Sequence, residues 1–238
     1  MDATVRLADP IVPQVIQFLR QAIIEMQLKP GQALSENDIA RRCGVSRQPV
    51  REAFIKLREV GLVQILPSRG TYVVKISVGE VLNARFVREA VECAIVRTAA
   101  GLIDDAGCAR LEALIADQKR AAAAGDYRAF YVLDEAFHRE IANIIECDYA
   151  VRVVESARAQ TDRVRFLSLP GATSLDILIA QHQAIADALK ARDSAKAEIV
   201  MRQHLQEILA ALPSLARQHP DIFEDAKIPA HAASMMPR

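Results

Sequence analysis

The segment that most constrains this chain is residues 35–75, whose pattern predicts two short helices, a tight turn and a β-hairpin in that order. Ser35 and Ser46 are each placed to cap one helix, since serine side chains accept hydrogen bonds from the amides of a first helical turn. Gly44 supplies the turn between the helices, and Gly61 ends the second one. This order is typical of a winged helix-turn-helix.

The second of these helices separates basic and apolar side chains onto two neighbouring faces. At about 100° per residue, Arg47, Arg51 and Arg58 lie on one arc. The adjacent arc is apolar and is formed by Val50, Ala53, Phe54, Leu57 and Val60. One face can therefore pack on the domain while the other offers guanidinium groups, as a helix in the DNA major groove requires.

The predicted hairpin gives this domain a basic tip. Two β-rich runs, 62–66 and 71–75, flank the turn PSRG, so Arg69 is expected near backbone phosphates or in the minor groove. An ordinary surface helix followed by a chance hairpin is the alternative interpretation. The complete order of caps, turn and hairpin favours DNA binding.

The run LSENDIARRCGVSRQPVREAFIKLREVGLV, followed by RGTYV, resembles the N-terminal signature of GntR-family transcriptional regulators. Its core SRQPVREA is close to the family's usual SRTPVREAL, although Asn37 stands where the family often has arginine. The resemblance implies a DNA-binding regulator of transcription rather than an enzyme. The residues expected at the DNA are Asn37, Ser46, Arg47, Gln48, Arg51, Arg69 and Gly70.

Charge is unevenly divided along the 238 residues, although the net charge of the whole chain is zero. Residues 1–77 contain eleven Lys or Arg and seven Asp or Glu, a net charge of +4. Residues 78–238 contain nineteen and twenty-three, a net charge of −4. A polyanion partner such as DNA is therefore expected at the N-terminal part only.

The cysteines and the hydropathy of the sequence bear on its compartment. The four cysteines show no CxxC spacing and no disulfide-dense pattern, which favours a reducing cytoplasm. The sequence shows no signal peptide and no apolar run long enough to span a bilayer, so no membrane partner is expected.

The periodicity divides the chain into a DNA-binding domain over 1–77, an all-helical domain over 78–230 and a tail over 231–238. An amphipathic helix over 12–27 is expected to support the winged motif. The pattern then becomes helical throughout, with six helices near 80–100, 105–124, 127–146, 149–168, 175–191 and 194–212. Short connections between such helices predict an antiparallel bundle, and hence a mostly α protein.

Four polar side chains fall among the apolar residues of the predicted bundle. Asp134 and His138 are four residues apart and share the apolar face of their helix. His182 and His204 lie on the apolar faces of two other helices. Burying an unpaired carboxylate costs several kcal/mol, so these groups are expected to meet a partner inside the bundle.

One aspartate and three histidines form a coherent set of ligands for a divalent metal, with zinc expected first and nickel, manganese or iron as alternatives. A single buried histidine is more often a satisfied core residue. An Asp–His pair at this spacing is often only a surface hydrogen bond. The four residues together favour a metal site over these two interpretations.

The segments DEAFHREI, QHQAIADAL and MRQHL resemble the three metal-bearing segments of the FCD-type ligand-binding domain in FadR-type GntR regulators. By matching positions, this resemblance implies that Asp134, His138, His182 and His204 are the metal ligands. The resemblance covers roughly residues 10–215.

Arginines near the predicted metal site are candidates for binding an effector. Arg88 lies on an apolar arc in the segment ARFVREAVE, which resembles the family's first bundle helix, and its guanidinium could clamp a carboxylate. An ion pair with Glu92 at i,i+4 is an equal alternative. Family members commonly sense small organic acids, so such an acid is the expected effector. Further candidate residues are Arg85, Arg163 and Arg165.

These patterns predict a homodimeric regulator, a repressor by preference, that binds palindromic operator DNA. A small carboxylate bound beside a divalent metal would control its operator affinity. A metalloregulator, for which the metal itself is the signal, is the first alternative. A metal-dependent hydrolase is disfavoured, because no HExxH-type helix places a general base beside the ligands.

Overall fold

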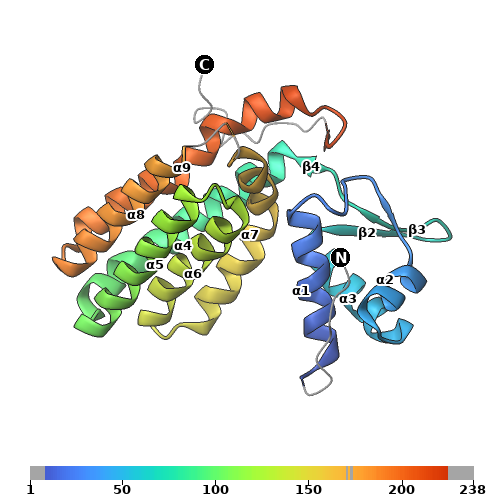
Figure 1. Ribbon diagram of the computed structural model, residues 1–238, viewed down its shortest axis with the longest axis horizontal. Helices are drawn as coiled ribbons and strands as arrows, with labels where there is room; N and C mark the ends of the chain where they lie inside the picture. Colours follow the sequence, from blue (N-terminus) through green and yellow to red (C-terminus); the bar gives the residue numbers. More distant parts are fainter. Residues whose placement is uncertain (1–8, 170, 172–173, 225–238) are drawn as a thin grey trace.

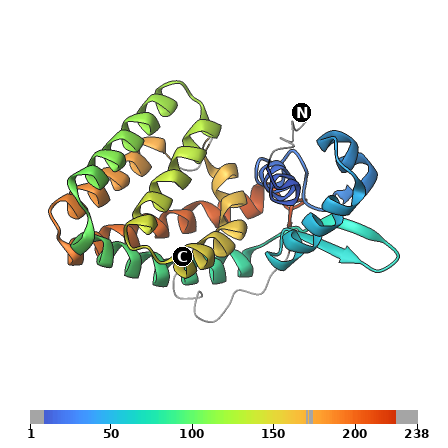
Figure 2. The same cartoon turned by 90° about the horizontal axis from the view of Figure 1, so that it is seen from below.

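The computed structural model of the protein describes residues 9–169, 171 and 174–224. Over these residues the chain forms a winged DNA-binding head, which ends at residue 75, and a helical body that lies beside it (Figure 1). Seen from below, the first helix of the head faces the body across their junction (Figure 2). The mostly α fold class predicted from the sequence is confirmed.

The head contains three helices and a small antiparallel sheet. Its strands are ordered β1-β3-β2, and Val63 pairs with Val73 while Leu66 pairs with Gly70 across the wing. The helices bury a common apolar core against this sheet. The elements are α1 (Ile11–Ile24), β1 (Ala33–Leu34), α2 (Glu36–Cys43), α3 (Arg47–Glu59), β2 (Val63–Leu66) and β3 (Gly70–Val73).

The local signals of the helix-turn-helix behave largely as the sequence predicts. The Ser35 side chain accepts a hydrogen bond of 3.3 Å from the amide of Asp38, and Gly44 closes α2 with a φ of 66°. That φ is one that residues with a Cβ adopt at a steric cost. Ser46 occupies the N-cap position of α3, but its side chain makes no capping hydrogen bond.

The body contains the six predicted helices, within one or two residues of the predicted starts. Helix α4 packs against α6, α7, α8 and α9. The elements are β4 (Ile76–Ser77), α4 (Val78–Leu102), α5 (Asp105–Ala123), α6 (Tyr127–Ile144), α7 (Asp148–Ser168), α8 (Leu175–Lys190), α9 (Ser194–Gln218) and β5 (Phe223–Glu224). None of the described helices has the length and apolarity needed to cross a membrane.

The end of the body differs from the sequence-based expectation in two ways. Helix α9 continues through Pro213 to Gln218 instead of ending at 212, because Leu212 and Leu215 are buried in a common cluster. After it, β5 pairs in parallel with β4, so the domain predicted to be all-helical contains a strand. The predicted tail 231–238 lies outside the described residues.

Candidate functional site

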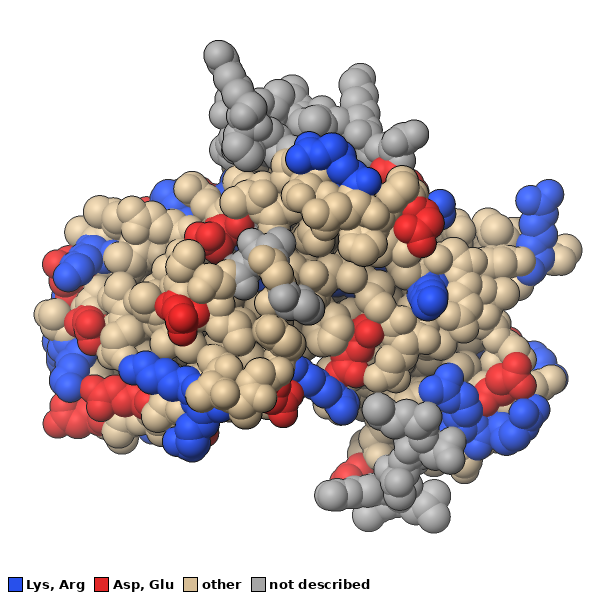
Figure 3. Space-filling model, turned by 45° about the horizontal axis from the view of Figure 1, so that its top comes forward, with Lys and Arg blue, Asp and Glu red and all other residues tan. Residues whose placement is uncertain are grey.

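The surface that the sequence assigns to DNA binding is formed by the start of α3, the start of α2 and the wing. The seven residues expected at the DNA are all exposed. Arg47 and Arg51, one turn apart on α3, both contact Glu36 at the start of α2, with Nη2–Oε2 and Nε–Oε2 distances of 2.7 and 2.8 Å. Basic side chains gather at the far end of the head, with acidic ones among them (Figure 3). The two arginines are therefore held side by side by one carboxylate.

The four predicted metal ligands converge inside the body. Asp134, His138, His182 and His204 are all buried, and one ligand atom from each lies within 4.8 Å of the other three. The Nε2 atoms of His138 and His204 are 3.1 Å apart. Nε2 of His182 lies 3.4 Å from Oδ1 of Asp134. Ligands on one ion at about 2.1 Å are separated by roughly 3.0–3.4 Å, so these spacings suit a shared divalent metal.

A second set of side chains orients the three imidazoles. The Nδ1 atoms of His182 and His204 lie 2.7 and 2.9 Å from the side-chain oxygens of Gln118 and Gln181. Nδ1 of His138 lies 2.7 Å from Oε2 of Glu92. Acceptors at Nδ1 favour the tautomer in which Nε2 keeps a free lone pair, the arrangement common around metal-bound histidine.

Electrostatics at the cluster also favour a metal. Burial lowers the pKa of all three histidines, that of His182 to about 3. Burial raises the pKa of Asp134, but the charge of Arg165 and those of its other neighbours outweigh this effect and lower it to about 2. At neutral pH the cluster therefore presents neutral imidazoles and a carboxylate, the forms that bind a metal.

Orphaned polar atoms support the same interpretation. Nε2 of His182 and Oδ2 of Asp134 are buried and have no hydrogen-bond partner among the described residues. A metal ion bound here would accept a lone pair from each of these two atoms. The donor set, its spacing and its unpaired atoms all fit a divalent metal with mixed nitrogen and oxygen ligands.

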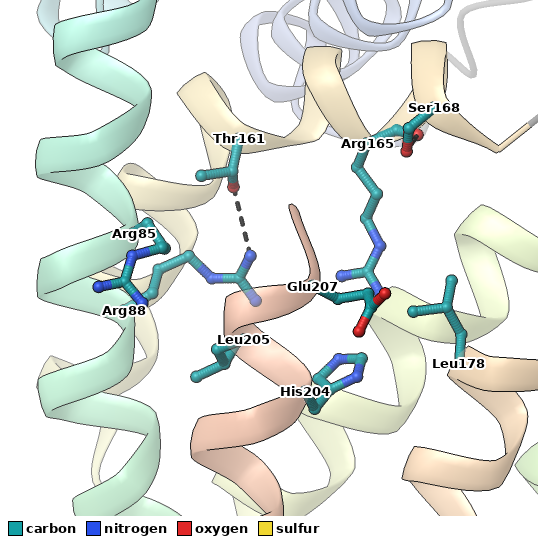
Figure 4. A pocket seen from close by; sticks show the side chains of 9 residues that line it. All are labelled: Arg85, Arg88, Thr161, Arg165, Ser168, Leu178, His204, Leu205 and Glu207. Atoms are coloured by element: carbon teal, nitrogen blue, oxygen red, sulfur yellow. Dashed lines mark hydrogen bonds between the residues drawn. The ribbon is translucent and has the colours of Figure 1, made fainter. Parts of the chain in front are cut away.

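A cavity that is partly open to solvent lies directly beside the cluster. Arg88 from α4 and Arg165 from α7 extend into this space from two sides, with His204 of α9 near both (Figure 4). Nη2 of Arg88 is buried and has no hydrogen-bond partner among the described residues. The other lining residues are Arg85, Thr161, Ser168, Leu178, Leu205 and Glu207.

The structure separates the predicted effector residues into two groups. Arg85 and Arg88 line the cavity, and so does Arg165. Arg163 does not lie among the lining residues: it donates a 2.6 Å hydrogen bond to the carbonyl of Val74 at the end of the head. The two arginines therefore lie on opposite faces of α7: Arg165 lines the cavity, and Arg163 contacts the junction with the head.

The two interpretations of Arg88 prove to be compatible. Its Nε donates to Oε1 of Glu92 at 2.6 Å, as the alternative of an i,i+4 pair requires. Its Nη1 donates to the hydroxyl of Thr161 at 3.3 Å, which leaves Nη2 for a ligand in the cavity. Because Oε2 of Glu92 lies 2.7 Å from Nδ1 of His138, a single carboxylate links the cavity arginine to a histidine of the cluster.

The sequence did not indicate several residues of this site. The spacing indicates Glu92 only as a partner of Arg88, while Gln118 and Gln181 lie on helices whose pattern gives no sign of a polar interior. Arg158 is buried, and its Nη2 lies 3.5 Å from Oδ2 of Asp134. One feature of the sequence does point to Arg158: it stands four residues before Asp162 on a half-apolar helix, the spacing of an ion pair.

Replacing Glu92 with glutamine is expected to weaken metal binding about 10–100-fold, because Glu92 both orients His138 and increases its basicity. Competition with a chromophoric chelator measures the affinity directly. Glu89→Gln is the matched control, since Glu89 lies one turn earlier and pairs with Arg85 and Arg202 instead. Equal affinities in the two variants would contradict this role of Glu92.

Two family descriptions match the chain. Residues 12–73 match "Bacterial regulatory proteins, gntR family", and residues 84–207 match "FCD domain". These ranges coincide with the winged head and with most of the body. The GntR-type and FCD-type resemblances drawn from the sequence are confirmed.

Two relatives agree with these matches. The chain is 40% identical to the HTH-type transcriptional repressor RspR of Escherichia coli (strain K12), over 91% of this chain and 95% of that protein. It is 28% identical to a probable D-xylose utilization operon transcriptional repressor of Paenarthrobacter nicotinovorans, over 92% and 96%.

Two solved structures share the fold. Escherichia coli McbR/YncC superposes with a TM-score of 0.78 at 20% identity, covering 89% of this chain and 99% of that one. A putative GntR transcriptional regulator from Rhodococcus sp. RHA1 gives a TM-score of 0.70 at 27% identity, covering 84% and 98%. The relatives named here are regulators of transcription and not enzymes.

Proposed function

Because the chain belongs to the GntR family of bacterial transcriptional regulators and carries an FCD domain, we propose that it is a repressor controlled by a small carboxylate metabolite. The acid binds in the cavity beside a divalent metal held by Asp134, His138, His182 and His204. Two copies of the chain bind the half-sites of a palindromic operator. Relatives described as repressors support the sign of this regulation.

The observation that carries this proposal is the position of α7 between cavity and head. Thr161, Arg165 and Ser168 of this helix line the cavity. From another face, Gln160 donates hydrogen bonds of 3.0 and 3.1 Å to the carbonyls of Val60 and Gly61, directly after α3. A ligand that moves α7 therefore moves the support of the DNA-reading helix.

A buried series of ionic contacts runs parallel to this path. Asp134 contacts Arg158 at 3.5 Å, and Arg158 contacts Asp162 at 3.6 Å. Asp162 in turn lies 3.2 Å from Nη2 of Arg20 on α1 of the head. These three ion pairs connect the metal site to α1 of the head. A change in charge at the metal can therefore alter the contacts of the head.

The residues of the cavity suit a carboxylate. Nη2 of Arg88 can donate to one carboxylate oxygen of the ligand. Arg165 can donate to another once a metal ion replaces its contact with Asp134. The metal, when bound, adds a Lewis-acidic centre for a carboxylate or hydroxyl oxygen of the ligand. Ligand binding alters operator affinity only by its difference in affinity between two arrangements of the heads.

A metalloregulator is the second candidate, and one observation favours it. The three imidazoles are already neutral and oriented at neutral pH, so a metal ion could bind without any organic ligand. Its binding would replace the 2.6 Å contact between Asp134 and Arg165. In that mechanism Arg165, released from Asp134, changes the position of α7 by itself.

A thermal-shift screen of organic acids on metal-loaded protein tests the proposal. An acid present at 100 times its Kd stabilises the protein by about 2.7 kcal/mol, which corresponds to roughly 5–10 °C for a chain of this size. We expect this shift with His138 intact and its loss in His138→Ala. His219→Ala is the control, since His219 lies outside the cluster.

Operator affinity separates the two candidates. The proposal requires that metal alone changes operator affinity little and that metal with the stabilising acid changes it strongly. A full response to metal alone would favour the metalloregulator. Full metal content in His138→Ala would show that the ligand set has been chosen wrongly.

A further inference from the structure

The carboxylate of Glu36 occupies the centre of the DNA-reading surface. Its Oε2 accepts hydrogen bonds from Nε and Nη2 of Arg47, at 3.1 and 2.7 Å. Nε of Arg51 lies 2.9 and 2.8 Å from the two oxygens of the same carboxylate. These contacts span the helix-turn-helix from the first residue of α2 to the first two turns of α3.

The contacts leave a defined part of each guanidinium available. Arg51 meets Glu36 through Nε, so neither terminal amino group is used in that contact. Those two groups form the edge that can donate to both O6 and N7 of a guanine. Arg47 uses Nε and Nη2 toward Glu36, which leaves Nη1. Glu36 therefore leaves different donor groups of the two arginines available to the groove: both terminal amino groups of Arg51, but only Nη1 of Arg47.

Glu36 also occupies a place that suits a phosphate. It is the first residue of α2, where free backbone amides and the helix dipole attract an anion. In helix-turn-helix proteins the first helix crosses the DNA backbone. A carboxylate here repels phosphates from this helix end, and it keeps the two arginines from binding phosphates in many orientations. Both effects weaken non-specific binding more than specific binding.

We propose that Glu36 is a positioning residue for operator recognition: it fixes Arg47 and Arg51 in base-reading orientations and disfavours non-specific phosphate contacts. The arrangement raises the ratio of specific to non-specific affinity more than it raises affinity itself. Specificity gained through a repulsive element is a general device of selective interfaces. Neither the metal nor the effector is needed for this role, so it can fail or hold independently of the proposed regulation.

Glu36→Gln tests the proposal, because glutamine keeps the shape of the side chain and one acceptor but loses the charge. The full-length wild type first selects an operator from a pool of random duplexes. Affinities for this operator and for a scrambled duplex are then compared by fluorescence anisotropy over a series of salt concentrations. Glu59→Gln is the control, since Glu59 is a glutamate of the same domain, at the end of α3, but pairs with Lys56.

We expect Glu36→Gln to bind the scrambled duplex about two- to fivefold more tightly and the operator several-fold more weakly. The specificity ratio then falls at least tenfold. On scrambled DNA, the slope of log K against log salt should steepen by about 0.9, as for one additional phosphate contact. Glu59→Gln should keep the wild-type specificity ratio.

Three outcomes would overturn the proposal. An unchanged specificity ratio in Glu36→Gln would reduce Glu36 to a surface ion pair of little consequence. A parallel gain in affinity for both duplexes would mean that Glu36 only weakens DNA binding in general, by repelling phosphates. An equal loss of specificity in Glu59→Gln would assign the effect to the net charge of the head. Circular dichroism of each variant shows that its fold is retained.

Discussion

Replacing Arg158 with methionine is expected to lower the free energy of unfolding by about 3–5 kcal/mol, the usual cost of removing one partner from a buried ion pair. Arg158 is 4% exposed, and it is the cation that lies between the carboxylates of Asp134 and Asp162. Methionine fills most of its volume but offers no charge. The two aspartates are both fully buried. Without Arg158 between them, their negative charges would repel each other.

Thermal or urea unfolding at fixed protein concentration measures this loss, which corresponds to a decrease in Tm of roughly 10 °C. Arg139→Met is the matched control, because Arg139 is exposed and pairs with Glu155 at 3.0 Å. Such surface pairs contribute at most about 1 kcal/mol. If both variants unfold like the wild type, the buried series of ion pairs contributes nothing to stability, and its proposed role toward the head loses support.

Acid is expected to destabilise the metal-free protein well before ordinary carboxylates are protonated. The pKa of His182 is about 3 in the folded chain and 6.5 when unperturbed, so between these values the unfolded chain binds the extra proton. Stability therefore decreases as the pH falls through this window, by about 1.4 kcal/mol per pH unit for His182. His138 and His204, whose pKa values are also lowered by burial, act in the same direction.

Urea titrations of chelator-treated protein between pH 7 and 5 test this effect. Between pH 6.5 and 5, His182 alone should account for a loss of about 2 kcal/mol. His182→Gln removes the titrating group and should flatten the pH dependence by that amount, while His219→Gln should leave it unchanged. A wild-type profile that is flat over this range would mean that the histidines of the cluster are already accessible to protons.

The features that the sequence predicted well are those encoded by neighbouring residues. The helices of the body follow from apolar periodicity and from breaks such as Gly125, and the start of α2 follows from Ser35. The four cluster residues were identifiable because each places a polar group on an apolar face, which is a local anomaly. Only a three-dimensional partner could explain the four anomalies together.

The features that the sequence did not predict depend on contacts between distant positions. Gln118 and His182 are 64 residues apart, and so no periodicity could pair them. Strand β5 forms because Phe223 is buried against the segment that joins head and body, which no signal near residue 223 indicates. The sequence predicts Arg163 as an effector residue because the pattern of its own helix does not indicate which face meets Val74.

The geometry of α7 has a consequence for how such proteins diverge. Successive residues of this helix serve different tasks: Gln160 supports the head, Thr161 lines the cavity, and Asp162 continues the ionic series. A mutation on α7 that favours a new metabolite would thus also disturb the support of the DNA-reading helix and hence the affinity for DNA. New ligand preferences should accumulate instead on α4, α8 and α9, from which Arg85, Leu178 and Leu205 also line the cavity.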